Sequence, residues 1–275
     1  MTSPSEPGER PSVYTTDHSA SVLRTHSWRT AENSVAYLVP HLKPGLEILD
    51  VGCGPGSITV DLARLVPDGH VTGIEYVPDP LDSARARARS EGVGNVSFSV
   101  GDAHALPFPD SSFDVVHCHQ VLQHVADPVQ VLREMRRVAR PGGLVACRES
   151  ASLSWSPASE PLEAWFRLKA TVAAAKGGNP SPGGRIHVWA QQAGFARERI
   201  VRSAGAWCFS SDEEREYWGG SMGSRARSSG FVKTALEGGY ATEEELERMA
   251  QGWDAFVKDP DAWFGLLHGQ ILCRK

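Results

Sequence analysis

Three glycines alternate at Gly52, Gly54 and Gly56, directly after an apolar run and directly before a segment of helical character. Glycines in such a turn let the chain bend sharply and let a ligand approach backbone atoms that a Cβ would block. The dinucleotide fingerprint G-x-G-x-x-G would need a further glycine at the position of Ser57, so the spacing disfavours a nicotinamide oxidoreductase. The turn therefore predicts a polar ligand that is not held through a pyrophosphate.

Two acidic residues follow the turn at positions that suit a nucleoside. Glu75 lies about 20 residues further on, and a carboxylate there can accept hydrogen bonds from both hydroxyls of a ribose. Asp102 follows the next strand and can accept from the exocyclic amino group of a purine, while Ala103 leaves room for the ring. Because ligands of open parallel sheets bind at the carboxyl ends of the strands, we expect these residues to meet at one edge.

The elements that must position these residues follow an alternating pattern. From residue 46 to residue 150, short apolar runs alternate with amphipathic segments, which is typical of a parallel sheet wrapped by helices. We predict strands over residues 46–51, 70–76, 96–100, 113–118 and 143–149. Asp79 and Asp127 each precede a proline and are predicted to cap the helices that follow, and Val131, Leu132, Met135 and Val138 to form one apolar helical face.

The regular alternation of apolar runs and amphipathic segments ends after residue 150. We predict a helix over 159–176, a loop or lid hinge over the Gly/Pro/Ser stretch 177–184, a helix over 186–193, a strand over 200–209, a polar helical block over 212–259 and a last strand over 264–273. The predicted organisation is a disordered tail (1–12), N-terminal cofactor-covering helices (13–45), a ligand-binding core (46–150) and a remainder (151–275) in which core strands carry helical insertions. We expect a single domain overall.

Composition narrows the class of protein. The chain has 275 residues, a net charge of −5 and five dispersed cysteines without a C-x-x-C pair. These features disfavour a nucleic-acid partner and a zinc site, and they suggest buried free thiols in a reducing cytoplasm. His117, His119 and His124 are close in sequence, but no carboxylate or cysteine completes a ligand set, so we predict no metal. We also predict no membrane span, no secretory signal, and either a monomer or a homodimer.

Residues 46–149 resemble the class I S-adenosylmethionine-dependent methyltransferases, in the broad group that includes the ubiquinone and menaquinone C-methyltransferases. The resemblance is carried by LDVGCGPG (49–56), Glu75, GDAHALPFPDSSFDVV (101–116) and LREMRRVARPGG (132–143), in this order. It implies S-adenosylmethionine as cofactor, with the glycine turn at the methionine part, Glu75 at the ribose and Asp102 at the adenine. It also implies a doubly wound, mostly parallel, seven-stranded Rossmann-like α/β sheet with helical insertions as a substrate lid. The predicted cofactor-binding residues in this region are Asp50, Gly52, Cys53, Gly54, Glu75, Tyr76, Gly101, Asp102, Ala103, His119 and Gln120.

Upstream of the first strand, Trp28-Arg29-Thr30-Ala31-Glu32 is similar to an Arg-Thr-Ala-Glu segment of the glycine N-methyltransferases. There the arginine holds the cofactor carboxylate, which implies the same role for Arg29. A surface pair between Arg29 and Glu32 is the alternative interpretation. In related enzymes an upstream tyrosine closes over the cofactor, and Tyr14 is the candidate here.

The resemblance implies methyl transfer from a sulfonium, which already carries its leaving group. The protein then needs mainly to position the two reactants and to exclude water from them. An acceptor that is a hydroxyl or an acidic carbon also needs a base, for which His119 comes first, followed by His124 and His18. His119 could equally be a packing residue. Seven tryptophans lie after residue 150, and a lid carrying several of them would form an aromatic acceptor pocket.

We therefore expect methyl transfer to an O, N, C or S nucleophile of a small, partly apolar molecule in the cytoplasm. The alternative is a protein of the same fold that binds the cofactor but acts in regulation or in a non-methylating rearrangement, because fold alone does not settle function.

Overall fold

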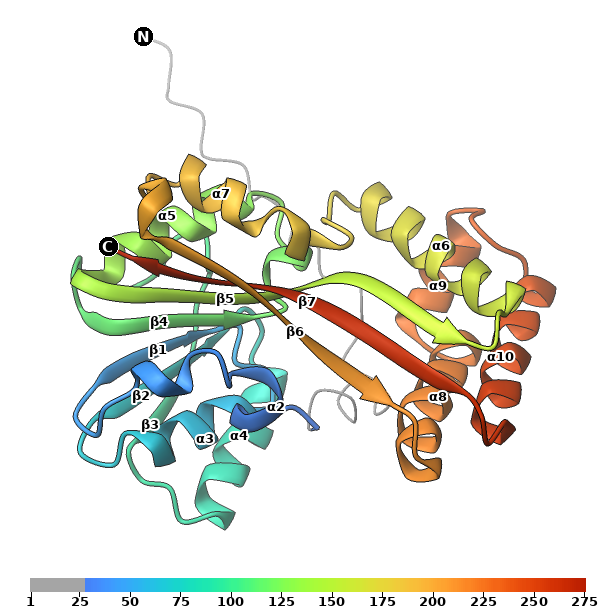
Figure 1. Ribbon diagram of the computed structural model, residues 1–275, viewed down its shortest axis with the longest axis horizontal. Helices are drawn as coiled ribbons and strands as arrows, with labels where there is room; N and C mark the ends of the chain where they lie inside the picture. The colour runs from blue at the N-terminus through green and yellow to red at the C-terminus, as the bar shows by residue number, and fades with distance from the viewer. Residues whose placement is uncertain (1–27) are drawn as a thin grey trace, which may run out of the picture.

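A computed structural model describes residues 28–275, and Figure 1 shows one long sheet that runs through the molecule. The order of its seven strands is β3-β2-β1-β4-β5-β7-β6. Only β7 runs against its neighbours β5 and β6, so the sheet is mostly parallel, as predicted. The strands are β1 (Glu47–Val51), β2 (His70–Glu75), β3 (Val96–Val100), β4 (Phe113–His119), β5 (Ala139–Ser156), β6 (Ile200–Phe209) and β7 (Trp263–Arg274).

Helices cover both faces of the sheet. They are α2 (Ala31–Ser34), α3 (Ser57–Leu65), α4 (Asp79–Ser90), α5 (Pro128–Val138), α6 (Glu160–Ala175), α7 (Ile186–Gln192), α8 (Asp212–Arg227), α9 (Gly230–Glu237) and α10 (Glu243–Lys258). Short 3-10 turns are η1 (Val39–His41), η2 (Leu122–His124), η3 (Pro182–Gly184) and η4 (Arg197–Arg199). In Figure 1, α5 and α7 lie on one face of the parallel strands, and α2, α3 and α4 on the other. The helical insertions expected after residue 150 are α6, α8, α9 and α10. None of the helices within residues 28–275 combines the length and the apolar character needed to cross a membrane.

Local sequence explains where two of these helices begin. Asp127 accepts a hydrogen bond from the Gln130 amide at 2.9 Å and caps α5, as predicted. The prediction for Asp79 is wrong: α4 already starts at Asp79, and its N-cap is Pro78, whose side chain cannot accept a hydrogen bond. Because Pro78 adopts helical backbone angles, the helix starts at Asp79, one residue earlier in the chain than the predicted start at Pro80. The predicted apolar face of α5 is confirmed, because Val131, Leu132, Met135 and Val138 are all buried.

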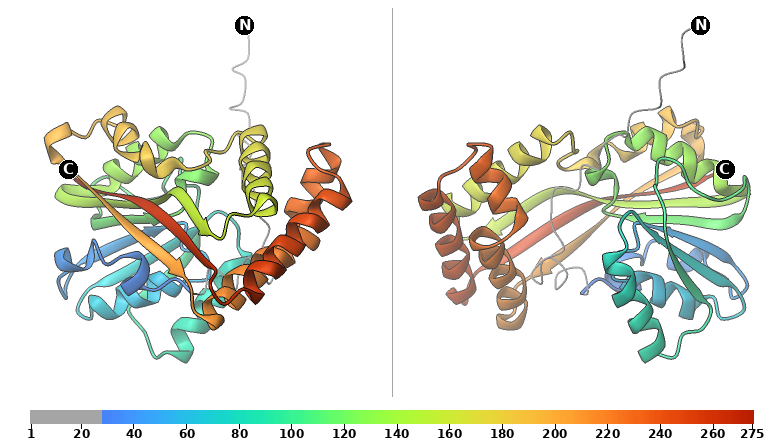
Figure 2. Two further views of the ribbon diagram at one scale, coloured as in Figure 1. Left: turned by 45° about the vertical axis from the view of Figure 1, so that its right-hand side comes forward. Right: turned by 180° about the vertical axis from the view of Figure 1, so that it is seen from behind.

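Strand β5 is much longer than residues 143–149. It begins at Ala139, which pairs with Phe113 of β4. It continues to Ser156 because β7 pairs with it antiparallel, from Leu144 opposite Arg274 to Ser156 opposite Trp263. The outer halves of β5, β7 and β6 leave the parallel region and carry α6, α8, α9 and α10, which we call the helical lobe (Figure 1). Figure 2 shows the lobe set to one side of the parallel core.

The lobe has an apolar core of its own. Trp165, Trp253 and Phe264, from α6, α10 and β7, are buried within it. All five cysteines are free thiols, and four are buried as predicted. Cys208 is exposed instead, because it lies on β6 at the edge of the sheet.

Candidate functional site

The glycine turn after β1 adopts a conformation that requires its glycines. Gly52, Gly54 and Gly56 all have positive φ, at 70°, 53° and 78°, where side chains are strained. A Cβ on Gly52 would lie 2.4 Å from a methyl group of Val121, whereas a Cβ on Gly54 would meet open space. Gly52 and Gly54 line a cavity at the carboxyl ends of the strands, and Gly56 instead packs closely against α4.

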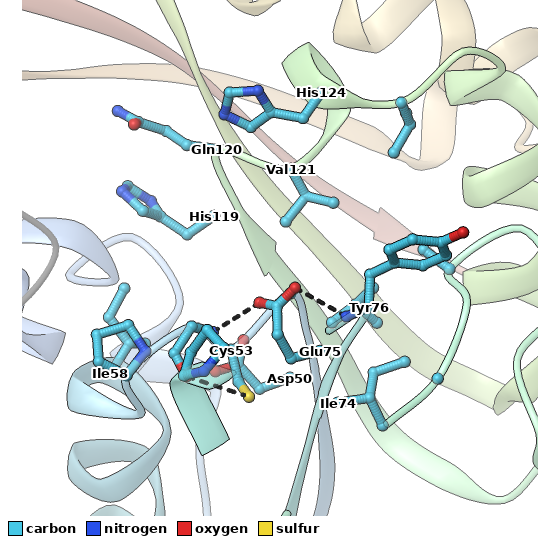
Figure 3. A pocket seen from close by; sticks show the side chains of 18 of the residues that line it. Asp50, Cys53, Ile58, Ile74, Glu75, Tyr76, His119, Gln120, Val121 and His124 are labelled. Atoms are coloured by element: carbon cyan, nitrogen blue, oxygen red, sulfur yellow. Dashed lines mark hydrogen bonds between the residues drawn. The ribbon is translucent and has the colours of Figure 1, made fainter. Parts of the chain in front are cut away.

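Glu75, at the end of β2, ties the turn to the neighbouring loop. One of its oxygens accepts from the Gly54 amide at 3.0 Å, and the other accepts from the Tyr76 amide at 2.8 Å. Both oxygens of the Glu75 carboxylate are thereby held in place at the end of β2. Figure 3 shows Glu75 facing the cavity, with His119 and Gln120 across from it.

After β3, Asp102 stands at the rim of the same cavity with Gly101 and Ala103. Its carboxylate accepts from the His104 backbone amide at 2.8 Å and lies 2.9 Å from the Nδ1 atom of that residue. This arrangement fixes the carboxylate while leaving about half of the side chain exposed.

All predicted cofactor-binding residues that the structure describes line this first cavity, and His124 does too. Tyr14 and His18 lie outside the described residues. The predicted site did not include several further lining residues, among them Ile58, Val121, Val125 and His104. Ile58, Val121 and Val125 are ordinary apolar positions that no motif marks, whereas His104 lies within the motif over residues 101–116.

Asp50 lines the cavity but is 3% exposed and already bonded on both oxygens. It accepts from the Thr59 hydroxyl at 2.6 Å and lies 2.8 Å from Nδ1 of His117. Asp50 therefore joins β1 to α3 and β4 beneath the glycine turn. The same contact gives a structural role to His117, one of the three histidines that are close in sequence.

Arg29 reaches into the cavity from the N-terminal side. It donates a 2.8 Å hydrogen bond to the side-chain oxygen of Gln120, whose φ is 55°. The Gln120 amide nitrogen lies 2.9 Å from His268, which in turn is 3.0 Å from Arg148. Arg148 also donates to the carbonyl of Asn33 at 2.8 Å. This chain of contacts anchors the guanidinium through Arg148 on β5 and His268 on β7, two residues that lie outside the sequence motifs.

The two candidate bases among the described residues, His119 and His124, both have lowered pKa values. His119 is 5% exposed, and within residues 28–275 neither of its ring nitrogens has a hydrogen-bond partner. Burial, with the nearby charges of Arg29 and Arg148, lowers its pKa well below the usual value. Burial, with Arg29 and Lys169, lowers the pKa of His124 to about 3. Each imidazole can therefore accept a hydrogen bond, but each is a weak base.

Glu149 is a buried residue that sequence reasoning missed. One oxygen accepts from the backbone amides of Val121 and Leu122 at 2.8 and 2.7 Å, which holds the start of η2 against β5. Burial raises the pKa of Glu149 to about 8, despite these bonds to its charged form. The carboxyl group is thus protonated at neutral pH.

A second cavity adjoins the first. Arg29, Gln120 and His124 line both. From there the second cavity extends along the outer half of β5 to α6, α8 and α9 of the helical lobe, with Phe166, Trp218 and Phe231 in its wall. Of the seven tryptophans after residue 150, Trp218 lines this cavity, whereas Trp165 and Trp253 are buried in the lobe core. That the cavity takes the acceptor stays a prediction.

Comparison with known proteins agrees with this geometry. The model of a family described as "Methyltransferase domain" matches residues 42–205. A methyltransferase of Schizosaccharomyces pombe, named as uncharacterised, is 36% identical over 262 residues, covering 92% of this chain and 93% of that protein. A demethylmenaquinone methyltransferase of Listeria welshimeri is 37% identical over 127 residues, which cover 46% of this chain and 54% of that protein.

A solved structure shares the fold at lower identity. It is phosphoethanolamine N-methyltransferase 2 of Haemonchus contortus, in complex with phosphomonomethylethanolamine and S-adenosylhomocysteine. The two chains superpose with a TM-score of 0.51 at 20% identity, over 83% of this chain and 49% of that one.

Proposed function

This chain belongs to the methyltransferase domain family, and from that premise we propose that it transfers a methyl group from S-adenosylmethionine to a small, partly apolar organic molecule. The observation that carries the proposal is the first cavity, because it gathers the glycine turn, Glu75, Asp102 and Arg29 at one edge of the sheet. Their chemistry matches the successive parts of that cofactor: an amino acid, a ribose and an adenine.

The residues present fit the cofactor. The Gly54 position offers open space where a side chain would intrude, and the buried nitrogens of His119 face the cavity without partners in the described chain. We propose that Glu75 receives the ribose hydroxyls, Asp102 the adenine amino group and Arg29 the carboxylate. When bound, the cofactor supplies a methyl group on a sulfonium, which is its own leaving group.

The chain's own contribution is positioning and exclusion of water. Arg29 is held by Gln120, and the second cavity, with Phe166, Trp218 and Phe231 in its wall, gives the acceptor a site next to the first. The lowered pKa values of His119 and His124 suit an acceptor that binds with little need for a strong base. We propose that neutral His119 orients the acceptor or takes up a proton that is already acidic.

Binding of S-adenosylhomocysteine, measured by calorimetry, tests the cofactor site. Glu75→Ala should weaken binding about tenfold or more, because charge-assisted hydrogen bonds are lost, while Glu198→Ala on the exposed turn η4 should not. Equal affinity of the two variants would refute the role of Glu75.

Mass spectrometry of products then tests the reaction. The protein is incubated with methyl-labelled cofactor and a panel of phenols, quinones, thiols and amines, and a labelled product is expected. An unlabelled isomer of one substrate would instead support the non-methylating alternative.

A further inference from the structure

The charges of the second cavity are all of one sign. Its described lining contains Arg29, Lys169 and Arg225, and no aspartate or glutamate of the described chain lines it. The protein as a whole is acidic, with a net charge of −5. A cationic cavity in an acidic protein is a local feature and points to a ligand of negative charge.

Lys169 is the distinctive member of this set. It lies on α6, partly buried, and within residues 28–275 its ammonium group has neither a hydrogen bond nor an ion pair. Its Nζ atom lies 6.0 Å from the ring centre of Trp165 and 5.8 Å from that of Phe166. Aromatic faces attract a cation weakly, but they do not replace the hydrogen bonds that an ammonium makes in water.

Burial has a measurable consequence for this side chain. It lowers the pKa of Lys169 to about 8, and the charge of Arg225 on α8 acts in the same direction. The charge of Lys169 also helps to lower the pKa of His124, which lines both cavities. Lys169 is therefore a partly desolvated cation close to the wall that the two cavities share, and an anion placed beside it would stabilise it.

The rest of the wall suits a flat, apolar body. Phe166 and Trp218 line the cavity from α6 and α8, and the indole nitrogen of Trp218 is buried without a partner in the described residues. Ser150 and Ser152 add hydroxyl groups from the outer half of β5. The combination offers hydrogen-bond donors and a cation beside an aromatic wall, in which Phe166 and Trp218 both stack on buried Phe264.

We propose that the second cavity binds the methyl acceptor as an organic anion, whose carboxylate or phenolate oxygen is anchored by the Lys169 ammonium while its flat body packs on Phe166 and Trp218. The end to be methylated then points toward Arg29, Gln120 and His124, where the first cavity begins. This inference rests on the proposed function and names the chemical class of its acceptor.

The test compares charged and neutral probes of equal shape. Naphthoate and naphthamide are titrated by calorimetry into the full-length protein, with and without S-adenosylhomocysteine, and dinitrophenolate is compared with dinitroanisole. We expect the anion of each pair to bind about tenfold or more tightly. The pair with the larger preference tells whether carboxylate or phenolate is the better anchor group.

Variants assign the preference to one side chain. Lys169→Met should remove it while leaving naphthamide affinity unchanged, and Lys169→Arg should keep it. Lys176→Met is the matched control, because Lys176 follows the same helix but bonds to Thr234 outside the cavity. The preference should also decline above about pH 8, where Lys169 loses its proton; Arg225, Arg29 and neutral His124 nearby keep their charge states there.

Equal binding of the paired probes, binding of neither, or an unchanged preference in Lys169→Met would overturn the proposal. Failure of S-adenosylhomocysteine to bind would overturn the proposed function instead, because the probe preference is also measured without it.

Discussion

The glycine turn offers a matched pair of substitutions with the same backbone cost and different surroundings. Gly52→Ala and Gly54→Ala each place a Cβ on a residue of positive φ, which costs about 1–2 kcal/mol. Only at position 52 does the new atom collide, at 2.4 Å from Val121 Cγ2. Overpacking of this kind costs about 1–3 kcal/mol.

Val121 has little freedom to move aside. Its backbone amide is bonded to buried Glu149, and a β-branched side chain is stiff at χ1. We therefore expect Gly54→Ala to lower the free energy of unfolding by about 1–2 kcal/mol, and Gly52→Ala by about 2–5 kcal/mol, as the sum of the backbone and overpacking costs.

Urea unfolding followed by far-ultraviolet circular dichroism measures both variants against the wild type. The double variant Gly52→Ala with Val121→Ala removes the colliding methyl groups and should recover part of the loss, so the two substitutions should show favourable coupling. Equal destabilisation of the two alanine variants, or additive effects in the double variant, would refute the collision as the cause.

Two further predictions concern Glu149 and the helix caps. The pKa of Glu149 rises to about 8 on folding, so between about pH 4.5 and 8 the folded state keeps a proton that the unfolded state has lost. The free energy of unfolding of the wild type, relative to that of Glu149→Gln, should therefore fall by on the order of a few kcal/mol as the pH rises through this range. Chemical unfolding across this range checks it, and a pH-independent difference would contradict a buried neutral carboxyl. Asp127→Ala should cost about 1 kcal/mol through loss of the cap on α5, whereas Asp79→Ala, which removes no cap bond, should cost less than half of that in the same assay. Equal losses would restore Asp79 as a capping residue.

The sequence predicted the parallel half of the molecule because its signals are local. Each strand there is a short apolar run, and the glycine turn, Glu75 and Asp102 follow strand ends that must meet at one edge. Their convergence on a single cavity is a consequence of topology, which the alternating pattern already indicates.

The rest of the site depends on contacts that no local signal marks. Arg148 and His268 meet because β7 pairs antiparallel with an extension of β5, and the length of that extension was not predicted. The polar-apolar alternation of residues 150–156 is compatible with a strand, but what makes it one is the partner more than a hundred residues later. Lys169 likewise sits on an ordinary amphipathic helix, and only the packing of the lobe shows that it faces a cavity.

The wall shared by the two cavities has a thermodynamic consequence. Arg29, Gln120 and His124 belong to both, so a ligand that shifts or orders them in one cavity changes the free energy of binding in the other. Such coupling is reciprocal. If the bound cofactor changes the affinity for the acceptor by some factor, the bound acceptor changes the affinity for the cofactor by the same factor. Gln120 is the natural centre of this linkage, because its side chain bonds both Arg29 and His268, so a ligand that displaces it from one cavity also changes these contacts.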